Sequence, residues 1–499
     1  MGYYFISVGG SGARVLESLA HLCAAGLLPN NERRGQLYAM AIDPDVGNGN
    51  LNRTHTLLNC LNGFKNIKVG EGTPLLKTSV KLANPFVWSP TPKNMCLDDI
   101  IFYQNYSGTP LGKLYESLYT QRERMTELDV GFRGHPSIGA AVMGMKAVTD
   151  VESAWGNLIN AVQSDVKTGG SAKIFLAGSV FGGTGAAGLP TIARLLREIF
   201  ATYVQSGTVR IGGALLLPYF SFSPTSQQKE ESGLFASSDN FLTNTKAALH
   251  YYADTGKDNY DLMYFIGDET MAPISTFSVG AATQRNDAHI VDLFAAMAAL
   301  HFYGNDSGQH CYYISRNQKN VFRWEDFPDV SMEDGSVVSV RERFVQFVRL
   351  VFAYLYIVKP ILQDLASGRE AKNPHAWYVN YWQDKISAGA PEVRSFEKYA
   401  EDFAGWLHQV EDSSGARRVE LINPKAFRSG NGQIQIDPDL FPELDYGSSK
   451  LTIKGVADLL ASGEGGGFPW PWPRRRNQNA GTAQGFGLFL RRLYDSCKA

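Results

Sequence analysis

Two glycine-dense stretches of the chain combine residue types that suit the binding of an anion. The first, VGGSGAR, contains Gly9, Gly10, Ser11, Gly12 and Arg14; the second, VFGGTGA, contains Phe181, Gly182, Gly183, Thr184, Gly185 and Ala186. Glycines let backbone N–H groups approach an anion closely, and the helix predicted after each stretch adds free N–H groups and a positive dipole. No Lys-Ser or Lys-Thr follows the glycines, so phosphate would bind through amides, dipoles and the Thr184 hydroxyl rather than a Walker A lysine. Each stretch taken alone also fits a tight strand-to-helix turn.

Two further loops carry polar residues directly after predicted strands or before predicted helices. Asp43 and Asp45 follow a strand in AIDPD. They either hold the water shell of a nucleotide's Mg²⁺, with Asp45 as an indirect ligand, or cap a turn. In GFRGHPSIG, Arg133, Gly134 and His135 precede a helical pattern, and Arg133 is either a phosphate contact or a surface arginine. The loops therefore predict a nucleotide site without identifying the nucleotide.

The first 300 residues contain the elements that position these loops. Short apolar strands are predicted at YYFISV, LYAMAID, KIFLAGS, VRIGGALLLP and DLMYFIGD, and helical patterns follow most of them. Strands that are apolar on both faces and alternate with helices indicate a largely parallel, Rossmann-like α/β sheet. Ligands of such sheets bind beyond the carboxyl ends of the strands, which is where the glycine stretches begin.

The chain divides into four predicted regions. Residues 1–283 form a nucleotide-binding domain with an insertion over 46–130, and residues 284–304 form a long central helix. Residues 305–445 form a smaller helical or α+β domain that contains the apolar helix VRERFVQFVRLVFAYLYIVKPIL, predicted to be buried. Residues 446–499 form a Gly/Pro-rich tail, whose motif FPWPWPRRR either docks a partner, such as a protein, or folds back on the preceding domain.

Composition restricts the classes of partner. The net charge of −2 gives no overall attraction to nucleic acid, which we expect to be bound only through an adaptor, if at all. We predict no membrane span, because no apolar run free of charges approaches the ~20 residues needed. The five cysteines lack CxxC spacing, which favours reduced thiols and a cytoplasmic location.

The order of these loops resembles that of the tubulin/FtsZ superfamily of GTPases, in particular its divergent bacterial tubulin-like members. GGTG between strand and helix resembles the family's GGGTG signature, with Phe181 in place of the first glycine. VGGSGA, AIDPD and RGHPSIG resemble its first, second and third nucleotide loops. LLLPYFSF resembles the fifth, where Pro218 matches the family's proline and Ser223 stands near its ribose-contacting glutamate.

Two matches lie far downstream. QRNDAHIVDLFAAMAALHFY resembles the family's central helix, with Asp287 where a residue reads the guanine edge and Thr283 where an aromatic stacks on the base. Asp326-Phe327-Pro328-Asp329-Val330 resembles the catalytic loop, which reads Asp-Phe-Ala-Asp-Val in FtsZ, with Trp324 in place of its asparagine. In the family, this loop's acids act on the nucleotide of the next subunit, so Asp326 and Asp329 are the implied catalytic residues.

The resemblance implies a GTP- and GDP-binding, Mg²⁺-dependent GTPase that polymerises head to tail with itself, like other cytoskeletal proteins of the family. Two alternatives stay open. A nucleotide-dependent scaffold that does not hydrolyse GTP is favoured by Trp324. An NAD(P)-dependent oxidoreductase is less favoured, because Val15 occupies the last position of the dinucleotide fingerprint, which requires Gly or Ala.

Overall fold

The computed structural model describes a subset of the chain, namely residues 1–29, 36–64, 67, 69, 73, 75–76, 78–91, 93–128, 131–132, 135–221, 241–268, 271–273, 281–305, 310–316, 321–367, 386, 389–413, 419–422, 427–430, 433–436 and 482–498. Three predicted site residues, Arg133, Gly134 and Ser223, lie outside it, as does the tryptophan–arginine motif of the tail.

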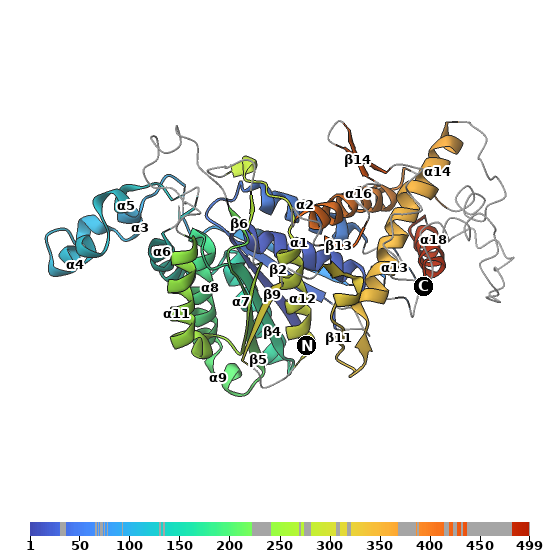
Figure 1. Cartoon of the computed structure of the whole chain (residues 1–499). Helices are drawn as coiled ribbons and strands as arrows, with labels where there is room; N and C mark the ends of the chain where they lie inside the picture. The colour runs from blue at the N-terminus through green and yellow to red at the C-terminus, as the bar shows by residue number, and fades with distance from the viewer. Residues whose placement is uncertain are drawn as a thin grey trace.

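A seven-stranded sheet forms the centre of the described structure, with helices on both of its faces (Figure 1). Its strand order is β3-β2-β1-β4-β5-β7-β9, and every neighbouring pair is parallel. The bounds are Gly2–Val8 (β1), Gln36–Ile42 (β2), Ser79–Trp88 (β3), Ala172–Ser179 (β4), Val209–Leu216 (β5), Leu262–Asp268 (β7) and Cys311–Arg316 (β9). The predicted fold class and all five predicted strands are confirmed, and β3 and β9 add a strand at each edge.

Strand β1 shows why the sheet is covered on both faces. Tyr3 and Phe5 belong to one hydrophobic cluster, and Tyr4, Ile6 and Val8 belong to the other, as the alternation of side chains along a strand requires. The helices that cover the first face are α1 (Gly9–Ala24), α2 (Gly49–Gly63) and α12 (Ile290–Gly304). Those that cover the second are α6 (Pro136–Thr149), α7 (Ala154–Lys167), α8 (Gly183–Ile199), α9 (Ala201–Gln205) and α11 (Phe241–Asn259).

The predicted insertion over 46–130 is largely part of this sheet architecture. Helix α2 packs on α1, and β3 pairs with β2. Sequence patterning misses β3 because its exposed and buried residues alternate irregularly around Asn84 and Pro85. A shorter segment projects from the body, at the left of Figure 1, and consists of α3 (Leu97–Ile100), η2 (Tyr103–Asn105), α4 (Pro110–Leu118) and α5 (Gln121–Met125).

The C-terminal helices share the first hydrophobic cluster with the sheet, so the described parts of 305–445 have no separate core. These helices are α13 (Val340–Ala353), a π-helical turn (Tyr354–Val358), α14 (Lys359–Ala366), α16 (Pro391–Asp412) and α18 (Thr482–Ser496). The expectation of a tail from residue 446 to the end is wrong at its C-terminal part, because α18 packs on α13 through buried residues such as Phe486, Leu490 and Leu493.

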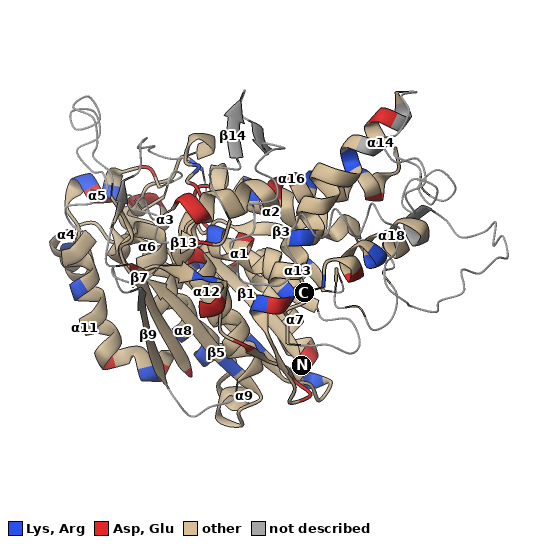
Figure 2. Cartoon of the chain, turned by 45° about the vertical axis from the view of Figure 1, so that its right-hand side comes forward, with Lys and Arg blue, Asp and Glu red and all other residues tan. Residues whose placement is uncertain are grey.

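One described helix, Val340–Asp364, is long and apolar enough to cross a membrane by length and composition. Most of its apolar stretch, 71%, is buried inside the protein, as predicted for a core helix. Acidic and basic residues are interspersed on the outer helices α5, α11 and α18 (Figure 2).

Short elements complete the described structure: β6 (Phe220–Ser221), β8 (Ala272–Pro273), η4 (Ala281–Thr283), β10 (Phe322–Arg323), η5 (Trp324–Asp326), β11 (Val330–Ser331), β12 (Val337–Val338), β13 (Val419–Glu420), β14 (Phe427–Gly430) and β15 (Gln433–Ile436).

Two helix boundaries differ from the sequence prediction. The central helix α12 begins at Ile290 instead of residue 284, because the His289 side chain accepts a hydrogen bond from Val291 N and Asp292 accepts one from His289 N. This capping box fixes the start of the helix. Helix α8 begins at Gly183, within the glycine stretch instead of after it, and Pro190 lies inside the helix.

Candidate nucleotide site

The two glycine stretches meet at the edge of the sheet where the chain changes direction. Strands β1 and β4 are neighbours, but the chain continues from β1 to β2 on one side and from β4 to β5 on the other. This is the topological switch point at which open α/β sheets bind ligands. A Cβ atom built on Gly9 would lie 3.4 Å from Thr184 Cβ, so the loops after β1 and β4 are in contact.

Three of the helices that start at this edge have N-termini without a side-chain cap. The N-cap residues of α1, α8 and α6 are Val8, Gly182 and His135; none gives a side-chain cap, and no acidic residue lies in these first turns. By contrast, α2, α7, α12 and α13 are capped by the side chains of Asn48, Ser153, His289 and Ser339. Uncapped N–H groups and the positive end of the dipole suit an anion.

Some of the glycines serve packing rather than ligand access. A Cβ atom on Gly12 would lie 2.3 Å from the carbonyl oxygen of Ala177, and one on Gly185 would lie 2.3 Å from that of Ser179. Side chains at these two positions would push α1 and α8 away from the sheet. The amide of Ala186 donates to the Gly182 carbonyl and is therefore occupied. Gly9, with φ at +73°, adopts the left-handed conformation that favours glycine.

Phe181, the departure from the family signature, is a core residue. Its ring is buried and packs on Phe241, Phe220 and Tyr219 at centroid distances of 4.5, 5.4 and 6.5 Å. Its side chain therefore anchors the loop after β4 to the first hydrophobic cluster.

The third predicted loop adjoins the other two. Gly131 has a φ of +101°, and a Cβ atom built on it would lie 4.0 Å from Thr184 Oγ1. His135, the N-cap residue of α6, has its Nδ1 3.1 Å from Glu123 Oε1 in α5. Of this loop, the structure thus brings Gly131 to the switch point and pairs His135 with the projecting segment.

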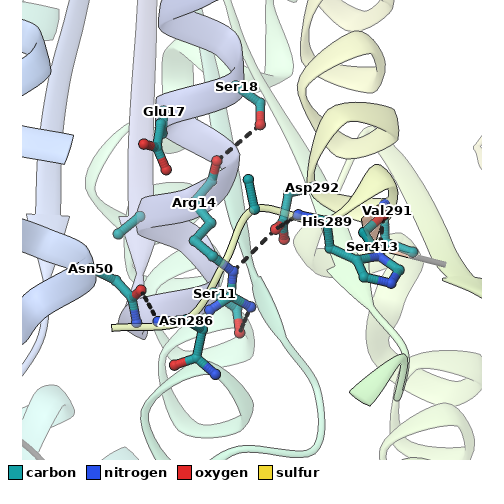
Figure 3. Close-up of polar contacts among 12 residues, drawn as sticks. Ser11, Arg14, Glu17, Ser18, Asn50, Asn286, His289, Val291, Asp292 and Ser413 are labelled. Carbon is teal, nitrogen blue, oxygen red and sulfur yellow. Dashed lines mark hydrogen bonds and ion pairs between the residues drawn. The ribbon is translucent and has the colours of Figure 1, made fainter. Parts of the chain in front are cut away.

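Arg14, predicted to bind the nucleotide, has its guanidinium in a buried structural network (Figure 3). Nε donates to Asp292 Oδ2 at 3.0 Å, and Nη2 contacts the hydroxyls of Tyr219, at 2.5 Å, and Ser11, at 3.5 Å. Tyr219 donates to Asp292 Oδ1 at 2.8 Å. Burial lowers the pKa of Arg14, but its interactions with Tyr219 and Asp292 have the larger combined effect, so the pKa of Arg14 is raised. We therefore infer that Arg14 holds α1 against α12 instead of contacting the ligand.

Asp43 and Asp45, at the end of β2, both take part in turn hydrogen bonds. Asp43 Oδ1 accepts from Asp45 N, and burial raises the pKa of Asp43 to about 8. Asp45 Oδ1 and Oδ2 accept from Gly47 N at 3.1 Å and Ala281 N at 2.6 Å. Both carboxyl groups therefore cap turns, which is one of the two roles that the sequence allowed for them. No group of three potential metal-ligating side chains occurs among the described residues.

The segment before α12 lies on the N-terminus of α2. Asn48 Nδ2 donates to Gln284 Oε1 at 2.7 Å, and Asn286 N donates to Asn50 Oδ1 at 2.9 Å (Figure 3 shows the second contact). Asn50 also adjoins the loop after β1, since its Nδ2 lies 3.1 Å from the Cβ position of Gly10. Sequence reasoning missed these amides; the signal was the run of asparagines that follows β2.

Three other residues predicted to contact the nucleotide are Thr283, Asp287 and Pro218. Thr283 and Asp287 lie in the exposed segment before α12, next to this amide cluster. Pro218 is buried between β5 and Tyr219. Proximity to the switch point is thus established for the segment that contains Thr283 and Asp287, and their contact with a base stays a prediction.

Asp326 and Asp329 lie far from the glycine loops of their own chain. Both are exposed, in and after η5, and the loop continues to Ser331, whose carbonyl packs against Gly304 at the C-terminal end of α12. Tyr303 OH donates to the carbonyl of Tyr4 near the start of β1, which marks this end of α12 as the amino edge of the sheet. Helix α12 spans about 22 Å at 1.5 Å per residue, and the glycine loops lie at its other end.

Trp324 is structural. It is buried, donates from Nε1 to the Leu421 carbonyl at 2.8 Å and stacks on Phe327 at 5.2 Å. Its position inside the protein holds the acidic loop in place.

Comparisons with known proteins give little beyond the geometry. No protein-family model and no curated protein matches the chain. Among solved structures, CetZ2 from Haloferax volcanii, in a GTPγS-bound protofilament, is 13% identical with a TM-score of 0.29, and covers 61% of this chain. CetZ from Methanosaeta thermophila is 14% identical with a TM-score of 0.26, and covers 60%. The chain spans only 59% and 52% of the lengths of those two chains. Scores this low carry no argument about ligand, activity or assembly.

Proposed function

We propose that the chain binds GTP at the switch point between β1 and β4, polymerises head to tail, and hydrolyses the nucleotide at the interface between two copies. The observation that carries the proposal is the convergence of uncapped helix N-termini, those of α1 and α8, on two touching glycine loops. The ordered motifs of the sequence support the choice of GTP.

Backbone groups would supply the binding of the phosphates. The first turns of α1 and α8 offer the N–H groups of Gly10, Ser11, Gly183 and Thr184, and two helix dipoles point toward the same place. The Thr184 hydroxyl adds a donor between the loops. A neutral site of this kind binds a polyanion without a lysine.

Magnesium would be held mainly by the nucleotide. Burial raises the pKa of Asp43 and so disfavours its charged form, which makes it a poorer ligand for a hard cation than an ordinary carboxylate. Asp45 keeps lone pairs beyond its two backbone hydrogen bonds and can bind a water of the ion. This fits an indirect role for Asp45, with the phosphates as the direct ligands.

The location of the acidic loop is the reason that the proposal includes a second copy. Phosphoryl transfer requires mainly positioning and a group that orients water. Asp326 and Asp329 are exposed at the amino edge of the sheet, whereas the glycine loops lie at the carboxyl edge. Stacking two copies in the same orientation brings these edges together, and such contacts are heterologous and give filaments.

A second candidate is a nucleotide-dependent scaffold with little hydrolysis. It is favoured by Asp326, whose Oδ2 already accepts from Arg323 N at 2.8 Å, and by Asp45, both of whose oxygens accept backbone hydrogen bonds. In this case assembly would follow GTP binding, and release of phosphate would not.

The replacement Gly182→Asp tests the phosphate site. Gly182 has extended backbone angles, φ −86° and ψ 166°, and its Cβ position meets only the Ser179 hydroxyl, at 2.9 Å. Asp is a preferred N-cap residue and should stabilise the protein by a few tenths of a kcal/mol. Its negative charge should repel the phosphates and weaken GTP binding about 100-fold. Juxtaposed like charges cost several kcal/mol, and every 1.4 kcal/mol weakens binding tenfold.

Gly182→Asn is the matched control, because it caps α8 without a charge. Titration with a fluorescent GTP analogue should give less than about tenfold weaker binding for this variant. Equal affinity of wild type, Gly182→Asp and Gly182→Asn would show that no phosphate binds at the start of α8.

A further inference from the structure

The projecting segment 96–127, called the arm below, carries an uncovered apolar surface. Leu111, Leu114 and Leu118 follow one another at helical spacing on α4, so they form a stripe on one face. Phe102, Tyr106 and Met125 add to the exposed apolar area, and all six side chains are between 42% and 66% exposed. The arm projects sideways from the body near the upper, carboxyl edge of the sheet (Figure 1).

The arm is held in a fixed shape by its own polar contacts. The Arg124 guanidinium lies over the rings of Tyr103 and Tyr115, at 4.6 and 5.4 Å, and Tyr115 OH donates to Asp98 at 2.8 Å. The side chains of Thr109 and Thr120 cap α4 and α5. Because these contacts order the arm before it meets anything, docking costs little conformational entropy.

The root of the arm adjoins the candidate nucleotide site. Leu128 N donates to the Met95 carbonyl at 3.2 Å, so the chain leaves and re-enters the body at one point. Glu123 of α5 contacts His135 at 3.1 Å, and Tyr119 OH donates to the Ser137 carbonyl at 3.3 Å, both at the start of α6. A molecule that sits on the glycine loops therefore lies beside the arm.

The charge and the exposed apolar area of the arm restrict the kind of molecule that can bind to it. The arm from 97 to 127 contains five acidic and three basic residues, and both signs are visible on α5 in Figure 2. This balance disfavours nucleic acid and anionic membranes. Six side chains that expose roughly 100 Å² each give about 600 Å², less than the roughly 800 Å² per partner of a stable interface. The arm alone is thus too small, and an adjoining surface must complete the contact.

We propose that the arm docks onto a second copy of this chain, the one that sits on the glycine loops in the head-to-tail assembly. The inference rests on the proposed function for the location of that copy. The arm extends the interface at the carboxyl edge and contacts the neighbour beside its acidic loop, so that the adjoining surface of the body supplies the area that the arm alone lacks.

The test is the triple variant Leu111→Glu/Leu114→Glu/Leu118→Glu. These residues are exposed, so the fold should persist, which the melting temperature checks. We expect binding of a fluorescent GTP analogue within twofold of wild type. The critical concentration for GTP-dependent assembly, measured by light scattering and pelleting, should rise at least tenfold.

The matched control is Met145→Glu/Val148→Glu/Val151→Glu, in the last turns of α6 and just after it, where the three side chains are also exposed. It should assemble like wild type. The proposal is overturned if the arm variant assembles like wild type, if both triple variants fail equally, or if wild type does not self-associate under any condition.

Failure of the proposed function gives a different pattern. If wild type binds no GTP but its self-association, measured by sedimentation velocity, is lost only in the arm variant, the arm docks a copy and the nucleotide assignment is wrong. A benzophenone at position 118 identifies the contacted surface: we expect cross-links to 322–338 of another copy, and cross-links confined to other surfaces would contradict the head-to-tail contact.

Discussion

At the scale of single residues, the glycine stretches divide into two kinds of position. Gly182 is accessible and caps a helix without a side chain, whereas Gly12 and Gly185 are required by close contacts with strand carbonyls. The sequence shows glycine density but not this division, because the contacts of Gly12 and Gly185 come from segments about 165 and 6 residues away, respectively. Arg14 illustrates the same limit, since its partner Asp292 lies on a distant helix.

The raised pKa of Asp43 predicts that the free energy of unfolding depends on pH. Its pKa rises from 3.8 to about 8 on folding, so the folded state binds the proton more tightly than the unfolded state. The contribution of this group is complete below about pH 4 and is lost as the pH rises to about 8, with a slope of at most about 1.4 kcal/mol per pH unit.

The variant Asp43→Asn isolates this effect, because the amide oxygen can still accept from Asp45 N. Urea unfolding from pH 5 to 8 should show the free energy of unfolding of wild type decreasing relative to that of Asp43→Asn. A difference that stays constant over this range would mean that Asp43 is ionised in the folded protein.

At the scale of elements, the strands and the glycine-loop helices were predictable, and the helix boundaries were less so. Five strands stand out as apolar runs, but β3 and β9 lack a clean pattern. The start of α12 depends on His289 as a cap, a residue type that is not among the usual capping residues. The acidic loop was found through its motif, while its location opposite the glycine loops depends on α12 and could be seen only in the structure.

Gly185→Ala tests the close packing of α8 on the sheet. The added methyl group would overlap the Ser179 carbonyl, so we expect a loss of about 1–3 kcal/mol in the free energy of unfolding. Gly144→Ala in α6 is the control, because nothing lies within 4 Å of its Cβ position and alanine favours the helix by about 1 kcal/mol. Urea denaturation should give opposite signs for the two variants. Stabilisation by both would show that α8 can move away from β4.

At the scale of the whole molecule, the two functional edges are separated by the length of the sheet. The glycine loops of one copy and the acidic loop of the same copy lie at opposite ends of α12, and the arm extends the edge that holds the loops. Under the proposed function, a monomer would present an incomplete site at each end, and only a head-to-tail pair would combine the two. Hydrolysis would then be a property of the assembly.

The most direct measurement of this claim is phosphate release from a mixture of two inactive variants. Asp326→Ala/Asp329→Ala keeps the glycine loops and lacks the acids, and Gly182→Asp keeps the acids and lacks the phosphate site. Each alone should release phosphate at no more than a few per cent of the wild-type rate, and an equimolar mixture should exceed the sum of the two, because some interfaces then pair intact loops with intact acids. A mixture that releases no more than the sum of its parts, or an acid variant as active as wild type, would contradict hydrolysis between copies.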